Sequence, residues 1–249
     1  MFLIKIRKNE FNTAYFKKDV YLLEILSDEQ QNDEYFKKNI IITNELNSLN
    51  KYPYIICKHE LSDLPTIHAL ESTGFQLISV DIKLKTEVNK PLEIMNGIKN
   101  EFLIERINQK YECNFVDLLN KTQRFFDSTH FYKSPYLDNL LCDYFYKGWI
   151  LKNVKGRTNE NYIVTYEKEI IGFIFGNKDG RNIDIDLIWV SENFRKAGIG
   201  KFLILSLIKN SRCNEITVKT QINNYPAVKL YTKIGFNVIE VFSVFHRSN

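Results

Sequence analysis

Hydrophobic and polar residues follow strand-like and helix-like periods over most of the chain. In the first third, alternating or short apolar runs predict strands at 2–6, 20–26, 54–57 and 75–84, and helical spacing predicts helices at 35–49 and 64–72. In the last third, the same criteria predict strands at 162–166, 170–175, 183–190, 215–220 and 236–245, with helices at 200–209 and 226–234. Because strands and helices alternate, the pattern predicts a mixed α/β sheet.

A polar stretch from Lys85 to Lys90, ending at Pro91, is the best candidate for a boundary between two parts of the chain. We therefore expect an N-terminal α/β lobe over residues 1–90 and a second domain over residues 91–249. Two segments also resemble each other. Leu70 to Phe75 and Tyr231 to Phe236 each end a helix at a glycine and continue into an alternating strand. This similarity indicates either an internal repeat or chance, since such junctions are common.

Composition narrows the classes of protein. With 249 residues, of which 44% are hydrophobic, the chain can bury a sizeable core, which excludes disorder. A net charge of +4 is too small for a dedicated nucleic-acid binder. No window approaches the roughly 18 apolar residues of a membrane span. Charges interrupt the first apolar run, so we expect a cytoplasmic protein without a signal peptide. The four cysteines are dispersed, so neither a metal site nor a disulfide framework is expected.

The segment Arg195 to Gly200 has the composition of a phosphate-binding loop. It lies between a predicted strand that ends at Val190 and a predicted helix. Backbone N–H groups at the start of a helix lack intrahelical partners and attract anions, and glycines at 198 and 200 would let a pyrophosphate approach the main chain. The loop matches neither the Walker A pattern nor GxGxxG. The alternative is a glycine-rich turn that only begins a helix.

A second motif, Asn224 to Phe236, follows one strand later. Pro226 suits the first helical position, Asn224 suits the cap and Gly235 suits the helix end. Read alone, the segment is a well-capped helix in which Tyr231 belongs to the core.

Together the two motifs resemble those of the GNAT superfamily of N-acetyltransferases, in order and in spacing. The resemblance implies a GNAT acyltransferase fold, here with a smaller GNAT-like N-terminal lobe, and acetyl-CoA as co-substrate without a metal. It implies that the pyrophosphate lies on backbone amides and the pantetheine arm on a strand edge and on Asn224. The residues concerned are Arg195, Lys196, Ala197, Gly198, Ile199, Gly200 and Lys201 for the pyrophosphate, and Ile188, Trp189 and Val190 for the strand edge.

The implied reaction is direct attack of an amine on the thioester in a ternary complex. A backbone N–H on the strand ending at Val190 would polarise the thioester carbonyl. A thiol has a reference pKa of about 8.5 and a phenol one of about 10, so Tyr231 can donate its proton to the departing thiolate. We therefore expect Tyr231 to be the general acid.

The middle of the chain carries a looser resemblance. Arg124 to Asp127, Phe131-Tyr132 and Tyr144 to Ile150 are similar to the central signature of the dTDP-fucosamine acetyltransferases, which N-acetylate dTDP-4-amino-4,6-dideoxy-galactose. The resemblance implies a nucleotide-linked amino sugar as acceptor, used in surface-polysaccharide assembly. An arginine beside aromatic rings can clamp a diphosphate while the rings stack on the base or the sugar. The predicted acceptor-binding residues are Arg124, Phe125, Tyr132 and, on the N-terminal half, Asp81; the aromatic residues could equally be helix core.

Several alternatives stay open at this point. Asp81, Asp184 and Asp186 are candidates for a general base, or else solvated carboxylates on strand faces, and water could also remove the proton. The four histidines form no pattern and receive no role. The acceptor could instead be a protein N-terminus, a polyamine or an aminoglycoside, or the chain could be a catalytically silent acyl-CoA-binding module. By analogy with the family, the apolar strand from Val238 to Phe245 could pair across a homodimer.

Overall fold

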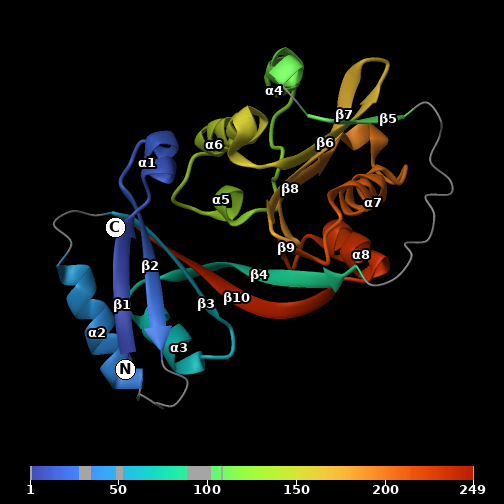
Figure 1. Cartoon of the computed structure of the whole chain (residues 1–249). Coiled ribbons are helices and arrows are strands. Elements are labelled where there is room, and N and C mark those ends of the chain that lie inside the picture. The colour runs from blue at the N-terminus through green and yellow to red at the C-terminus, as the bar shows by residue number, and fades with distance from the viewer. Residues whose placement is uncertain (1, 28–34, 49–52, 89–101, 108, 249) are drawn as a thin grey trace.

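One mixed sheet runs through the computed structural model, which describes residues 2–27, 35–48, 53–88, 102–107 and 109–248 (Figure 1). Its strand order is β1-β2-β3-β10-β4-β9-β8-β7-β6-β5. The strands are β1 (Phe2–Lys8), β2 (Val20–Ser27), β3 (Tyr54–Glu60), β4 (Gln76–Glu87), β5 (Leu103–Arg106), β6 (Glu160–Tyr166), β7 (Glu169–Asp179), β8 (Asn182–Val190), β9 (Glu215–Gln221) and β10 (Asn237–Arg247). The predicted mixed α/β sheet is confirmed.

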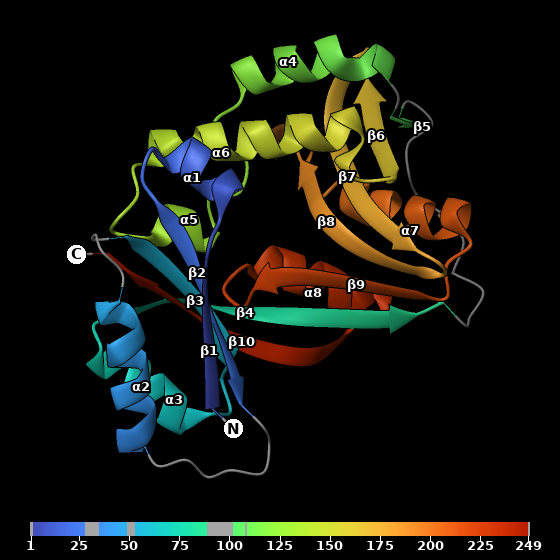
Figure 2. The ribbon, with the colours of Figure 1, turned by 60° about the vertical axis from the view of Figure 1, so that its left-hand side comes forward.

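Helices cover both faces of this sheet. They are α1 (Glu10–Phe16), α2 (Tyr35–Asn47), α3 (Leu64–Ser72), α4 (Glu112–Lys121), α5 (His130–Lys133), α6 (Asn139–Lys152), α7 (Ile199–Ser211) and α8 (Tyr225–Ile234). Helices α2 and α3 bury apolar side chains against β2 and β3, whereas α1, α5 and α6 form a separate aromatic cluster on the other face (Figure 2). Farther along the sheet, α7 and α8 share one core and α4 packs against β7 in another.

The middle helices differ most from the sequence-based prediction, which gave no bounds for a helix at α1 or between residues 109 and 152 and considered helix core only as an alternative for the aromatic residues of this stretch. Helix α6 explains why. Its Phe145 and Tyr146 lie in one apolar cluster and Ile150 in another, so this helix is buried on more than one side. A helix that is apolar around much of its circumference has no clear 3.6-residue stripe, and its pattern is therefore hard to recognise.

The two similar helix–glycine–strand segments are parts of a longer structural repeat. Each unit is a strand, a helix and a second strand: β3-α3-β4 and β9-α8-β10. The interval along the chain from the start of β3 to the start of β9 equals the interval from Gly74 to Gly235. The units exchange their last strands, since β10 lies between β3 and β4 while β4 lies between β10 and β9. These matches in length, order and pairing favour a repeat over chance.

The strand exchange affects two expectations from the sequence. The boundary predicted at residues 90 and 91 lies outside the described residues, and the segments on either side of it share one sheet. The C-terminal strand, suggested as a dimer edge, is flanked by β3 and β4 along residues Phe242 to His246, so this part has no free edge. Homodimerisation stays an untested prediction.

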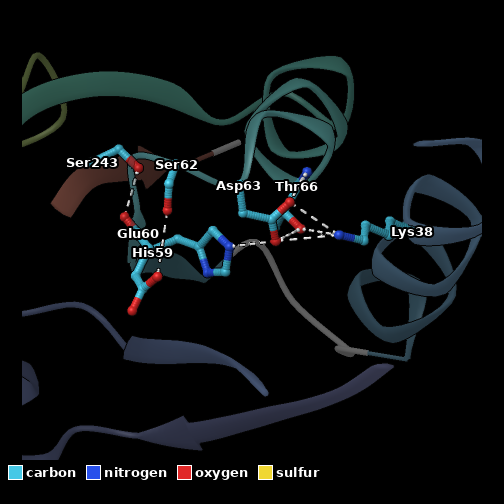
Figure 3. Close-up of polar contacts among 7 residues, drawn as sticks. All are labelled: Lys38, His59, Glu60, Ser62, Asp63, Thr66 and Ser243. Atoms are coloured by element: carbon cyan, nitrogen blue, oxygen red, sulfur yellow. Dashed lines mark hydrogen bonds and ion pairs between the residues drawn. The ribbon is translucent and has the colours of Figure 1, made fainter. Parts of the chain in front are cut away.

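A polar cluster fixes α3 to α2 in the N-terminal unit (Figure 3). Asp63 caps α3, accepting from the Thr66 amide at 3.2 Å, and binds the Nζ of the buried Lys38 at 3.0 and 3.2 Å. Nε2 of the buried His59 lies 2.9 Å from the same carboxylate. Although partial burial opposes ionisation, the hydrogen bonds from Thr66, His59 and Lys38 hold the pKa of Asp63 well below its usual range. At the equivalent place in the C-terminal unit, one repeat interval further along the chain, stands Asn224.

Candidate functional site

A cavity of about 700 Å³ lies where the two repeat units face the middle helices. Residues of β8, β9 and α8 line one part of it, and residues of α1, β3, β4, α5 and α6 line the other. Of the residues predicted from the sequence, Tyr231, Asn224, Ile188, Asp81, Asp184 and Asp186 line this cavity, whereas Trp189, Val190 and the loop 195–201 do not. The cavity therefore brings the C-terminal motifs together with elements from the first third of the chain.

Strands β8 and β9 separate at the cavity. They pair in parallel only from Asn182 to Ile185, opposite Glu215 to Val218, so the rest of β8 has no partner on the β9 side. The Ser191 amide donates to the Ile171 carbonyl on β7 at 2.8 Å. In an antiparallel pair, residues that bond to the neighbouring strand alternate with residues that do not. Counting back from Ser191, the backbone groups of Trp189 point toward β7, and those of Ile188 and Val190 point away from it. Two backbone sites thus face the open edge, where an extended ligand can pair with them.

The loop before α7 presents a run of unpaired backbone donors. None of the amides from Lys196 to Lys201 donates to another group in the described parts of the chain. The N-terminal end of α7 adds the positive end of the helix dipole, so this loop is suited to an anion such as a pyrophosphate. Arg195 to Gly198 are exposed, and Arg195 forms an ion pair with Glu192 at 3.2 Å.

The two glycines of this loop have different roles. Gly198 has φ +83, a left-handed conformation that β-carbon-bearing residues rarely adopt, and its missing Cβ leaves open space. A Cβ on Gly200 would lie 2.9 Å from Leu230 Cδ2 on α8. Gly200 therefore permits close packing of α7 on α8, in addition to the access for a ligand predicted from the sequence.

Asn224 begins α8, but its side chain does not cap the helix as the sequence suggested. Only its backbone carbonyl accepts from the Val228 amide, at 3.0 Å. The side-chain amide instead donates to Thr220 Oγ1 at 3.2 Å, at the end of β9. This contact holds the Asn224 side chain at the cavity wall, where its amide oxygen can face a ligand.

Tyr231 is 2% exposed and packs on Phe236 at a ring-centroid distance of 5.5 Å. Its ring lies in the core beneath α8, as the ordinary helix interpretation required, and it also lines the cavity. Its hydroxyl forms no hydrogen bond within the described residues, and burial raises its pKa, so the phenol keeps its proton at neutral pH. Tyr231 is thus a protonated donor next to the separation between β8 and β9.

Asp81 lies on the far wall of the cavity, buried to 4% exposure. Its carboxylate accepts from Lys58 Nζ at 2.7 Å, from Ser79 at 3.0 Å and from Gln221 at 3.3 Å. The expectation of a solvated strand-face carboxylate is wrong for Asp81, because α5 packs on β4 and covers part of the sheet face there. Its oxygens are occupied by donors, so Asp81 positions Lys58.

Asp186 is another carboxylate that tertiary contacts occupy. One of its oxygens accepts from Trp149 Nε1 at 2.8 Å, Asn153 Nδ2 at 2.6 Å and Arg157 at 2.8 Å. Its side chain is 14% exposed, so a solvated strand-face position is wrong here too. Asp184, in contrast, is exposed and accepts from Thr217 at 2.6 Å.

Three residues predicted to bind the acceptor do not reach the cavity. Arg124 is exposed on a turn, and only its backbone amide bonds, to Asp143 at 2.8 Å. Phe125 is core, 5.2 Å from Trp189 between ring centroids, and Tyr132 donates to Asp143 while stacking on Tyr146. The core interpretation holds for these two rings. The path of residues 122–129 directs these two rings toward the core. No local sequence pattern predicts this path.

Other residues line the part of the cavity where Arg124 and its neighbours were expected. The cavity is lined there by Phe11, Lys58, His130, Trp149, Lys152 and Arg157. Lys152 Nζ lies 4.1 Å from the centroid of Phe11, and Arg157 lies over Trp149 at 5.3 Å. Trp149 belongs to the stretch that carried the family resemblance, whereas sequence reasoning missed the other five because they come from several separate elements. The one available signal was the aromatic and basic content of residues 144–157.

The structure also bears on metal binding and on membrane-spanning helices. Among the described residues, no group of His, Cys, Asp and Glu side chains could hold a metal ion. In the same residues, no helix is long and apolar enough to cross a bilayer.

The part of the chain that carries the two motifs is similar to known proteins. Residues 115–236 match the model of the acetyltransferase (GNAT) family. The spore coat polysaccharide biosynthesis protein SpsD of Bacillus subtilis is 24% identical over 124 residues, 49% of this chain and 43% of that protein. The human cysteine-rich protein 2-binding protein is 30% identical over 108 residues, 43% of this chain and 14% of its own length. The chain thus spans less than half the length of these relatives.

Solved structures agree on the fold. A GCN5-related N-acetyltransferase from Sphaerobacter thermophilus superposes with a TM-score of 0.67 at 10% identity, covering 98% of this chain and 76% of that one. A tandem GNAT protein from the clavulanic acid biosynthesis pathway superposes with a TM-score of 0.56 at 7% identity, covering 92% and 75%. The expected GNAT acetyltransferase fold is therefore confirmed over nearly the whole chain.

Proposed function

We propose that this chain, a GNAT acetyltransferase by fold and by the family match of residues 115–236, transfers an acetyl group from acetyl-CoA to the amine of a nucleotide-linked amino-deoxy sugar. The observation that carries the proposal is one cavity with two chemically different walls. One wall holds Ile188, Asn224 and Tyr231, which are among the residues predicted to serve an acyl-CoA, and the loop from Arg195 to Gly200 follows β8 outside the cavity. The other wall is aromatic and carries Lys152, which suits a nucleotide diphosphate linked to a sugar.

The acyl-CoA wall supports the transfer reaction. The amides from Lys196 to Lys201 can receive the pyrophosphate, and the open edge at Ile188 and Val190, with Asn224, can receive the pantetheine arm. Acetyl-CoA supplies the activated acetyl group. The amine nitrogen would attack the acetyl carbon and lose its proton to water, while the Val190 N–H stabilises charge that develops on the thioester oxygen. Tyr231 would protonate the sulfur as the carbon–sulfur bond breaks and then take a proton back from water.

The acceptor wall favours an anionic substrate over a polyamine or an aminoglycoside. Lys58 and Arg157 line it in ion pairs with Asp81 and Asp186, and Lys152 lines it as well. Lys152 forms no ion pair with a carboxylate among the described residues. A charge placed this way can attract a phosphate. The similarity to a polysaccharide biosynthesis protein supports a sugar acceptor.

The direct test is acetylation of a substrate panel. We expect free thiol to appear when the protein is given acetyl-CoA and dTDP- or UDP-linked amino sugars, with dTDP-4-amino-4,6-dideoxyhexoses turned over best. Spermidine, kanamycin and a peptide N-terminus serve as comparison acceptors. Faster turnover of any of these would reject the sugar acceptor, and bound acetyl-CoA without turnover of the whole panel would support the silent module.

Lys152 gives a more specific prediction. In a Lys152→Ala variant the KM of the nucleotide sugar should rise by about tenfold, since a charge-assisted hydrogen bond contributes about 1.5–3 kcal/mol. The dissociation constant of acetyl-CoA should stay the same. Lys155→Ala is the matched control, because Lys155 pairs with Glu112 at 2.9 Å and lies outside the cavity. Arg124→Ala should also leave the sugar kinetics unchanged. Equal KM values for the Lys152 and Lys155 variants would reject this role of Lys152.

A further inference from the structure

A chain of hydrogen bonds ends at the acceptor wall of the cavity. His130 Nδ1 lies 2.9 Å from His246 Nε2, and His246 Nδ1 lies 2.6 Å from Tyr54 Oη. Tyr54 Oη is also 3.2 Å from Ser134 Oγ. The four residues come from β3, β10 and the segment around α5, and all of them are buried. The two histidines are 116 residues apart, so their pairing is a product of the fold.

Both histidines are neutral at physiological pH. Burial, together with Lys58, lowers the pKa of His246 to about 3, and burial, Lys58 and His246 lower the pKa of His130 well below 6.5. Asp81, which is bonded to Lys58, is the carboxylate nearest to that lysine on the same wall. A neutral imidazole has one donor nitrogen and one acceptor nitrogen. The position of one proton in the series of hydrogen bonds therefore determines the position of the next.

The direction of the chain follows from its phenol. Burial raises the pKa of Tyr54, so its hydroxyl keeps a proton that it can give to one neighbour. An imidazole nitrogen is the stronger acceptor, and the Tyr54–His246 contact is the shorter one, so Tyr54 donates to His246 Nδ1 and Ser134 donates to Tyr54. His246 then carries its proton on Nε2 and donates to His130 Nδ1. His130 must carry its proton on Nε2.

Because Nδ1 of His130 bonds to His246 and the residue lines the cavity, Nε2 is the ring nitrogen left to face the cavity. It has no hydrogen-bond partner among the described residues. The fully enclosed side-chain atoms without a partner in these residues are Thr158 Oγ1, Asn161 Oδ1 and Ser211 Oγ, so Nε2 of His130 is unpaired but not enclosed. His130 lines the cavity together with Thr129 and Lys58. A neutral N–H held in one tautomer by three further residues is a donor of fixed direction.

We propose that His130 is a specificity-determining residue whose Nε2–H, fixed by His246, Tyr54 and Ser134, donates a hydrogen bond to an oxygen of the acceptor substrate. Because this N–H is uncharged, it suits a sugar hydroxyl next to the cationic groups that meet the phosphates. His130 is thereby a donor and not the base that deprotonates the amine. The assignment of the oxygen to an acceptor sugar rests on the proposed function, whereas the tautomer does not.

The tautomer is tested first, without substrate. Long-range proton–nitrogen NMR spectra of the ¹⁵N-histidine-labelled protein should show His130 and His246 both protonated on Nε2, unchanged between about pH 5 and 8, where a free histidine titrates. Replacing Tyr54 by phenylalanine should abolish this single state. Protonation of His130 on Nδ1, or its titration in this range, would overturn the proposal.

Kinetics test the contact with the acceptor. His130→Leu should raise the acceptor KM about tenfold, as expected for loss of a buried hydrogen bond of about 1–1.5 kcal/mol. His130→Gln, which can keep an N–H near the same place, should lose less. Acetyl-CoA affinity and the melting temperature of each variant report on folding, and His68→Leu, at an exposed histidine of α3, is the control.

The outcomes separate the two proposals. An unchanged acceptor KM in His130→Leu would overturn the contact. An acidic limb in kcat/KM near pH 6.5 that disappears in this variant would make His130 a base and overturn its role as a donor. If the wild-type protein acetylates none of the sugars, the proposed acceptor fails, and the tautomer measured by NMR still decides whether His130 is held as a donor.

Discussion

A Tyr231→Phe variant is expected to turn over acetyl-CoA about 10²- to 10⁴-fold more slowly than the wild-type protein, the range typical of a lost general acid. The substitution keeps the ring that packs against Phe236 and removes only the hydroxyl at the cavity wall. Acetyl-CoA affinity should therefore change little. Steady-state rates with calorimetric binding of acetyl-CoA separate these two effects.

The raised pKa of Tyr231 is compatible with this role. Burial disfavours the phenolate, but the same enclosed site disfavours a free thiolate, so the proton moves between two groups that are both shifted upward. Tyr225→Phe provides the matched control, since Tyr225 lies on the same helix and is 74% exposed. A Tyr231→Phe variant as fast as the Tyr225→Phe variant would remove Tyr231 from the mechanism.

Replacing Asp63 by alanine should lower the free energy of unfolding at pH 7 by about 3 kcal/mol, because removing one member of a buried ion pair leaves the other charge uncompensated. Lys38 would lose two contacts with the carboxylate, and α3 would lose its cap. Urea unfolding of the full chain measures the difference.

The pH dependence of this loss has a definite sign. The pKa of Asp63 is lower in the folded chain than its unfolded value of about 3.9, so its contribution is complete above that pH and is lost as the pH falls below it. The wild-type and Asp63→Ala proteins should therefore become more alike in acid. A double variant, Lys38→Met with Asp63→Asn, keeps a helix cap and removes both charges, and it should recover much of the stability. A difference that stays constant from pH 7 to pH 3 would contradict the ion-pair explanation.

Local sequence patterns were enough to predict the segments that we propose to bind acyl-CoA. The loop at Arg195 to Gly200 and the helix at Asn224 to Phe236 are contiguous segments whose glycines, proline and cap residues act within a few positions of themselves. Most strands and helices of the two repeat units were predicted for the same reason, since each has one apolar face. Even there, the side chain of Asn224 contacts Thr220 and does not cap its helix, because the end of β9 lies beside it.

The residues that we propose to bind the acceptor could not be predicted from local patterns. Arg124 was expected from its aromatic neighbours, yet the chain turns it outward, and Lys152 and Arg157 at the end of α6 line the cavity instead. Histidines without any spacing pattern prove to be hydrogen-bonded across 116 residues. The sequence alone therefore determined the units that bind through their own backbone, whose geometry is local. Only the tertiary structure decided which side chains meet at the acceptor wall, because these side chains come from α1, β3, α5 and α6, which are far apart in the sequence and are brought together by the fold.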